Sequence, residues 1–301
     1  MSTTTDIRGS AAGPAAPAPQ DRKRMRVRFF TAPRLSKILI TLVLLLQVYP
    51  FFWLVTTSLR PAKDFASGNP LAVTTSPTLD NLTRAFENGD IPRFLLNSAL
   101  ITVVADILIV VLGMMGAYAL QVLGFRFSRL VLGLFLLGIV VPVQVALVPL
   151  FINYTNVGLL DTYPSVILPQ VGFALPMSIF LFMSFYSYVP KETYEAAALD
   201  GCGPYRLFWW ITTPMSLGTV ATVVFVNTIF IWNDFIFANT FILSTEKKTV
   251  PLGLQSYLGS MGSTDWTATF AAVSVTVTPL VLAFLVFSKV VVRGLSGTSR
   301  T

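Results

Sequence analysis

The chain has 301 residues, of which 54% are hydrophobic and only 12% are charged, whereas soluble domains carry about 25% charged residues. This composition predicts an integral membrane protein. The net charge of +7 is not gathered into a basic stripe with exposed aromatic residues, which argues against a nucleic-acid partner. One cysteine, Cys202, and no histidine exclude an internal disulfide, a Cys/His zinc site and a His-based triad, so we expect no catalytic, metal-binding or cofactor-binding residues.

Residues 1–33 are rich in Ser, Thr, Ala, Pro and Gly and end in a basic run, which predicts a disordered tail. A basic segment before an apolar run also fits a secretory signal. The apolar run from Leu35 to Leu59 is too long for a signal, and no small-residue cleavage site follows it. We therefore expect a retained first span.

A helix that crosses a bilayer needs about 20 mostly apolar residues. Six stretches qualify and predict an all-α protein with six transmembrane helices: approximately 35–58, 94–118, 129–152, 164–188, 217–242 and 266–290. The third and fourth contain Pro142, Pro149, Pro169 and Pro176. These prolines indicate either helices that are kinked or broken where they line a cavity or ordinary helix packing.

The distribution of basic residues predicts the orientation. Fifteen of the 21 Lys and Arg fall in the two terminal segments, the loop near 119–129 and the loop 189–216, against six in 59–93 and 243–265. Positively charged loops stay inside, so both termini and the loop 189–216 are expected in the cytoplasm.

The cytoplasmic loop 189–216 has the pattern of a short helix, a glycine and a second short helix. Pro190 suits a first helical turn and Gly201 suits a helix end, with alanines between them. Gly203 and Pro204 predict a second helix that runs to about residue 210 and is ended by Pro214 before the fifth span. By periodicity alone, this is either a docking element for a soluble partner or a plain amphipathic surface helix.

The spacing of Glu195-Ala196-Ala197, Gly201, Ile211 and Pro214 resembles the EAA loop of binding-protein-dependent ABC importer permeases, and more narrowly the maltose-type (MalG-like) carbohydrate permeases. The resemblance covers residues 35–297. Thr213 departs from the family pattern, which has leucine there. Further matches occur in the same order as in the family: Asn97-Ser98, residues 116–120, 125–127, Pro142-Val143-Gln144-Val145, 148–150, 158–163, Trp232-Asn233-Asp234-Phe235 and 251–254.

The resemblance implies a type I ABC importer permease fold over residues 34–297, in a bacterial cell membrane, with a C-terminal tail at 298–301. It also implies a second permease subunit in a heterodimer, two copies of a cytoplasmic ATP-binding subunit and an extracytoplasmic sugar-binding protein. The chain has no phosphate-binding Gly-x-x-x-x-Gly-Lys-Ser/Thr motif, so the ATPase is a separate chain. The residues expected to couple to it are Glu195, Ala196, Ala197, Asp200, Gly201 and Pro214.

Polar residues inside the spans are candidates for a translocation path, since intramembrane polar groups are costly. The path candidates are Gln144, Asn227, Asn233 and Asp234, with Phe173, Asn153 and Tyr154 as further cavity liners. Interhelical hydrogen bonding is the alternative for each. Asp106 in the second span is less typical of the family and is expected to face a partner permease or a water-filled cavity, or to be protonated.

Two other roles remain open. A permease of the same superfamily for a polyamine, phosphate or peptide would share the EAA loop. A stand-alone carrier or channel would show inverted repeats or charged pore rings, and neither is clear. Residues Arg293 to Gly297 resemble a tail that reaches the ATPase in some relatives, or form a basic stop after the last span.

Overall fold

The computed structural model describes residues 34–69, 72–88, 90–257 and 265–297, and every regular element in these ranges is helical. The expected tails, 1–33 and 298–301, lie outside the described residues. The chain forms two units that divide between Val48 and Tyr49, inside helix α1 (Arg34–Ser58). In the first unit, the side chains from Lys37 to Val48 are exposed, as expected of an apolar membrane helix.

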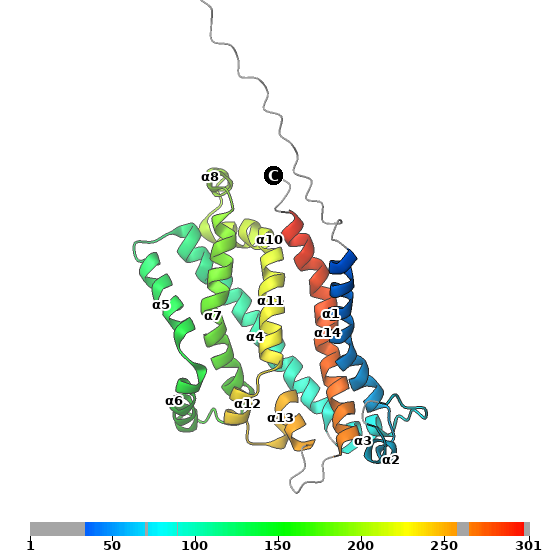
Figure 1. The fold of residues 1–301 in the computed structure, drawn as a ribbon. Coiled ribbons are helices and arrows are strands. Elements are labelled where there is room, and N and C mark those ends of the chain that lie inside the picture. Colours follow the sequence, from blue (N-terminus) through cyan, green and yellow to red (C-terminus); the bar gives the residue numbers. More distant parts are fainter. Residues whose placement is uncertain (1–33, 70–71, 89, 258–264, 298–301) are drawn as a thin grey trace, which may run out of the picture. The chain divides into compact units, whose positions relative to one another are not determined.

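The second unit is a bundle of long helices with short helices at both ends (Figure 1). The long helices are α4 (Ile91–Ala117) with its π-helical extension η1 (Tyr118–Leu123), α5 (Ser128–Val140), α6 (Val143–Asn156), α7 (Tyr163–Ser187), α11 (Leu217–Trp232) and α14 (Trp266–Gly297). Short helices at one end are α8 (Lys191–Leu199), α9 (Pro204–Arg206), η2 (Leu207–Thr212) and α10 (Thr213–Met215). Those at the other end are α2 (Ala62–Ser67), α3 (Asp80–Asn88), α12 (Ile236–Phe241), η3 (Thr245–Lys247), α13 (Val250–Leu254) and η4 (Gln255–Tyr257). These ends are called the α8 end and the α13 end below.

Four helices in the described ranges are long and apolar enough to cross a membrane, and up to six are if each of two bent pairs is one span. The bent pairs are α5 with α6, at 96°, and residues 204–215 with α11, at 73°. Each of the six expected stretches therefore coincides with helix, but the third contains the bend between α5 and α6, and the fifth is divided between α11 and α12.

The third expected span is broken at Val141 and Pro142. Proline disfavours helical backbone in the residue before it, and Val141 is extended, with φ −72° and ψ 116°. In the fourth span, α7 continues unbroken past Pro169 and Pro176. Of the two expected outcomes, a kinked or broken helix and ordinary helix packing, the third span shows the break, whereas the fourth is one continuous helix.

The fifth expected span ends early, because α11 stops at Trp232 rather than near residue 242. The Asp234 carboxylate accepts the N–H groups of Phe237 and Ala238, at 3.4 and 3.3 Å. A side-chain acceptor that competes for backbone N–H groups favours a helix start, so α12 begins anew beyond Asp234.

Helix α4 lies at the centre of the bundle and crosses α7 and α11 (Figure 1). Gly116 lets α7 approach, because a Cβ there would lie 3.1 Å from Cδ1 of Ile179. Buried residues recur every fourth position, the period of one helix face: Asn97, Ile101, Ala105, Ile109, Gly113 and Ala117.

The part of α4 at the α13 end is tied to the loop that precedes α13. Asn97 Nδ2 donates to the carbonyls of Glu246 and Lys248, at 2.8 and 2.9 Å, and its Oδ1 accepts from the Tyr163 hydroxyl at 2.9 Å. Ser98 Oγ accepts the N–H of Val250 at 2.8 Å. The Asn97-Ser98 pair therefore joins α4, α7 and α13.

Asp161 ties the start of α7 to the same loop. Its Oδ1 accepts the N–H groups of Leu243 and Ser244, both at 3.0 Å, and Lys247 Nζ lies 3.2 Å from Oδ2. Burial raises the pKa of Asp161, but these hydrogen bonds outweigh it and lower the pKa from 3.8 to about 2.

We expect Gly253→Ala to destabilise the α13 end. An added methyl group would overlap the ring of Phe94, which is buried, and overpacking costs about 1–3 kcal/mol. Thermal unfolding in detergent, followed by tryptophan fluorescence, would show a lower midpoint. Gly172→Ala is the matched control, since nothing described lies within 4 Å of a Cβ at that position. Equal midpoints for the two variants would contradict this packing.

We expect the stabilisation by Asp161 to be lost in acid. Its pKa is lowered from 3.8 to about 2 by folding, so the contribution is full above the unfolded value and disappears as pH falls through the folded value. The difference in unfolding midpoint between the wild type and Asp161→Asn should be constant above about pH 4 and shrink as the pH falls from about 4 to about 2. A difference that stays constant over this range would count against the ion-paired carboxylate.

Candidate functional site

The ends of α8 are set by two residues that the sequence analysis singled out. Thr193 N–H donates to the Pro190 carbonyl at 3.1 Å, which starts the helix directly after the proline. At the other end, Cys202 N–H donates to the Ala197 carbonyl at 3.0 Å across Gly201, whose φ is +82°. A side chain is strained at this backbone angle, so glycine fits the turn that follows α8.

The loop that carries α8 rests on the ends of two long helices. Tyr118, at the start of η1, donates to the Pro204 carbonyl at 3.0 Å, and its ring centroid lies 5.2 Å from that of Phe208. Ser216 Oγ donates to the Tyr186 hydroxyl of α7 at 3.5 Å. Burial raises the pKa of the Tyr194 hydroxyl on α8.

The second helical segment is longer than the sequence analysis expected. The sequence predicts that this segment runs to about residue 210 and that Pro214 ends it. In the structure, α9, η2 and α10 continue through Pro214 to Met215. Proline fits the first turn of a new helix, and Pro214 stands there in α10, after the π-helical turn of η2. Thr213, the departure from the family pattern, lies at this junction.

The expected coupling residues fall on two sides of the loop. Glu195, Ala196, Asp200 and Gly201 are exposed, whereas Ala197 is 6% exposed and packs against the bundle. Pro214 is exposed in α10, shortly before the start of α11. Leu199 was not singled out, yet it is 89% exposed. The exposed surface of α8 thus combines acidic, small and apolar side chains, which suits docking against a protein.

A cavity of about 400 Å³ lies among α6, α7, α11 and α12, and we call it the path pocket. It brings together three of the four expected path residues, Gln144, Asn227 and Asp234, with Phe173. Asn233 is outside its lining; its Nδ2 donates to the Ile229 carbonyl at 2.8 Å in its own helix.

Gln170 is a pocket residue that the sequence analysis missed. Its Nε2 donates to Asp234 Oδ2 at 3.4 Å, and Oε1 is buried with no hydrogen-bond partner among the described residues. A signal was present, because Gln170, Phe173, Ala174 and Met177 have the i, i+3, i+4, i+7 spacing of one helix face and all line the pocket.

The polar groups of the path pocket differ in how many hydrogen bonds they make to other described residues. Asn227 Nδ2 donates to the Val223 carbonyl at 2.9 Å and to Ser178 Oγ at 3.3 Å. The two remaining expected liners lie elsewhere: Tyr154 packs on Phe241 with centroids 5.1 Å apart, and Asn153 is exposed. The pocket therefore offers amide and carboxylate groups beside the rings of Phe173, Phe230 and Phe237.

Comparison with known proteins identifies the class. Residues 109–297 match the family of binding-protein-dependent transport system inner membrane components. The chain is 34% identical to the diacetylchitobiose uptake system permease protein NgcG of Streptomyces coelicolor, over 88% of each chain. It is 31% identical to the trehalose transport system permease protein SugB of Mycobacterium tuberculosis, over 86% of this chain and 94% of that protein. The chain belongs to this family of inner membrane permeases.

The fold is shared with a solved importer. A bacterial ABC transporter that imports the acidic polysaccharide alginate contains a chain with a TM-score of 0.75, covering 85% of this chain and 94% of that one, at 18% identity. The expected all-helical ABC importer permease fold is therefore confirmed. The protein is a multi-pass transport subunit of the inner membrane, not an enzyme, and works with an ATPase and a substrate-binding protein.

We expect Gln170→Ala to reduce solute uptake and Asn233→Ala to leave it nearly unchanged. Gln170 lines the path pocket, whereas Asn233 bonds within its own helix. Loss of one net hydrogen bond corresponds to roughly a two- to tenfold change. Initial uptake rates at equal membrane content would check this. A larger loss of uptake in Asn233→Ala than in Gln170→Ala would contradict the assignment of this pocket to the translocation path.

Proposed function

We propose that the chain is one of two permease subunits of an ATP-driven importer that carries a sugar across the bacterial plasma membrane. The observation that carries this proposal is the seating of α8. A short helix with an exposed acidic and small-residue face is held on α4 and α7 through Tyr118 and Tyr186. Such a helix transmits force between a soluble subunit and the membrane helices.

The orientation supports this role. Fifteen of the 21 basic residues lie in the segments that place the α8 end in the cytoplasm, where ATP is available. Residues 34–297 form the permease domain in this proposal, with 189–216 as the coupling loop. The tails 1–33 and 298–301 lie outside the described residues.

The coupling surface has defined parts. Glu195, Ala196, Asp200 and Gly201 face the ATPase, whereas Ala197 seats α8 on the bundle. Pro214 sets the course of the chain into α11. When ATP closes two ATPase subunits, α8 moves with them and the permease heterodimer shifts between inward- and outward-facing states.

A sugar is the substrate class that the path pocket and the relatives favour. Two relatives of this chain are named as permeases for diacetylchitobiose and for trehalose. Amide and carboxylate groups beside aromatic rings suit a neutral polyhydroxyl solute, delivered by an extracytoplasmic sugar-binding protein.

Two alternatives are weaker. A polyamine would call for several carboxylates, and the pocket has one, Asp234, among its described lining residues. A stand-alone carrier would leave the exposed surface of α8 without a purpose. Titration of sugars, polyamines and peptides against the partner binding protein separates the solute classes.

We expect Glu195→Lys and Gly201→Asp to abolish uptake while the chain stays in the membrane. Both changes lie on the exposed docking side of α8 and its turn. A mild-detergent pull-down of the tagged variants should recover the second permease but not the ATPase subunit. Glu87→Lys, an equal charge change on an exposed residue of α3, is the control. Wild-type uptake in both α8 variants would overturn the coupling assignment.

A further inference from the structure

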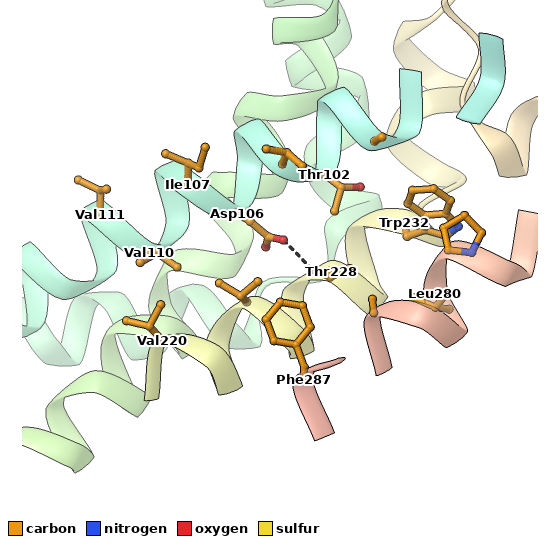
Figure 2. A pocket seen from close by; sticks show the side chains of 15 residues that line it. Thr102, Asp106, Ile107, Val110, Val111, Val220, Thr228, Trp232, Leu280 and Phe287 are labelled. Atoms are coloured by element: carbon orange, nitrogen blue, oxygen red, sulfur yellow. Dashed lines mark hydrogen bonds between the residues drawn. The ribbon is translucent and has the colours of Figure 1, made fainter. Parts of the chain in front are cut away.

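Helix α11 borders two cavities with different sides of its surface. The path pocket lies on one side and is lined by Val226 and Asn227, among other residues. A second cavity, of about 530 Å³, lies between α4, α11 and α14 and is lined by Val224 and Thr228 of the same helix (Figure 2). The direction in which α11 presents its side chains therefore decides which of them reach the path pocket.

Asp106 of α4 is a buried carboxylate that lies outside the lining of the path pocket. It is the sixteenth of the 27 residues of α4, about 22 Å along the helix at 1.5 Å per residue. Since the hydrocarbon core is about 30 Å thick, Asp106 lies deep in the membrane, where a carboxylate is costly and marks a function by default. The structure gives it a partner in the same chain: Thr228 Oγ1 donates to Asp106 Oδ2 at 2.7 Å (Figure 2).

The hydroxyl of Thr228 bonds to another helix rather than to its own. A threonine inside a helix can donate to the carbonyl four residues earlier, as Thr222 does to Gly218 at 3.1 Å. Thr228 instead donates to Asp106, which lies 122 positions away in the sequence. This hydrogen bond therefore joins α11 to α4, a task that a bond within α11 would not perform.

Asn227, the residue before Thr228, joins α11 to a different helix. Its Nδ2 donates to Ser178 Oγ of α7 at 3.3 Å. Neighbouring residues of an α-helix point about 100° apart, so the two bonds hold α11 from two directions. A helix held by one contact can turn about that contact, whereas two contacts in different directions prevent it. The bond to Asp106 is the shorter of the two.

Apolar packing specifies the direction of α11 only weakly. Val223, Val224 and Val226 are identical side chains that point in different directions from the same turn of the helix. One valine can replace another against a neighbouring helix with little change in contact area. Polar side chains that bond between membrane helices are more selective, because they bond in one arrangement and not in the others.

We propose that Asp106 is a positioning residue for translocation: through Thr228, it holds α11 so that Asn227 faces the path pocket. Asp106 does not touch the solute in this proposal and acts only through α11. Without the hydrogen bond, α11 can take other directions in which the pocket loses its amide group. The part that the pocket plays in transport rests on the proposed function, whereas the effect of Asp106 on α11 does not.

The first experiment measures the direction of α11 with a matched pair of thiols. Val226→Cys and Val224→Cys, which point about 200° apart, are each combined with Cys202→Ser in membranes that hold the whole importer. A polar methanethiosulfonate reagent is the probe, because the reactive thiolate forms more readily where water reaches it. We expect the thiol at position 226 to react faster than the thiol at position 224. The reverse order would overturn the assigned direction.

The same pair of thiols then tests Asp106. In Asp106→Leu, the ratio of the two labelling rates should fall about three- to twentyfold, the range for one hydrogen bond between membrane helices. Asp106→Asn keeps a carbonyl oxygen that can accept from Thr228 and should restore the ratio. General loosening of the bundle would raise both rates together. An unchanged ratio in Asp106→Leu would overturn the positioning role.

The second experiment measures initial uptake rates at equal membrane content. Asp106→Leu and Thr228→Val should each reduce uptake about three- to twentyfold, and the double variant should fall no further, because both changes remove the same bond. Thr228→Ser keeps the hydroxyl and should preserve uptake. Thr222→Val is the control, since its hydroxyl bonds to Gly218 within α11. Losses that multiply in the double variant would contradict a shared bond.

The two readouts separate this proposal from the function on which it rests. The labelling ratio reports the direction of α11 and does not depend on transport. An unchanged ratio in Asp106→Leu would overturn the positioning role and leave the proposed function intact. A lowered ratio with wild-type uptake would overturn the assignment of the path pocket to transport.

Discussion

The close approach of α4 and α7 is the contact on which the rest of the structure depends. Small residues such as Gly116 bring these helices together, and each helix then supports a different part of the site. At one end, Asn97 and Tyr163 join them to the loop before α13. At the other, Tyr118 and Tyr186 support the loop that carries α8. Displacement of α8 therefore acts on the two helices that also reach the opposite end of the bundle.

Helix positions could be predicted from the sequence because a bilayer demands long apolar runs, and those runs are visible without tertiary information. The ends of α8 followed from Pro190 and Gly201, whose backbone preferences are local. The breaks were harder to place. Pro142 interrupts a helix and Pro169 does not, although their local chemistry is the same, because neighbouring helices determine whether the freed carbonyl is tolerated. The early end of α11 depends on the Asp234 carboxylate finding backbone donors in the next helix.

Pocket residues were predicted less completely for a similar reason. Asn227 and Asp234 are polar residues in apolar stretches and could be selected on that ground. Asn233 has the same property but bonds to its own helix, and Gln170 was passed over although it meets Asp234 across 64 residues of sequence. The sequence shows which polar side chains lie in the membrane-spanning segments, whereas helix packing determines which of these side chains line a cavity. The fold shared with the alginate importer chain at 18% identity leaves such side chains free to differ.

Helix α11 separates two environments of opposite character. Its 16 residues span about 24 Å, less than the hydrocarbon thickness of about 30 Å, so the irregular backbone beyond Trp232 has to face protein or a water-filled space. One side of α11 meets the path pocket with its amide and carboxylate groups, and another side meets a cavity between α4, α11 and α14 that is lined mostly by apolar side chains. Rotation of α11 about its own axis would carry Asn227 away from the polar groups of the path pocket and Val224 toward them. The helix can consequently tilt or slide as a rigid unit together with its neighbours. The difference in polarity between its two sides opposes rotation about its own axis.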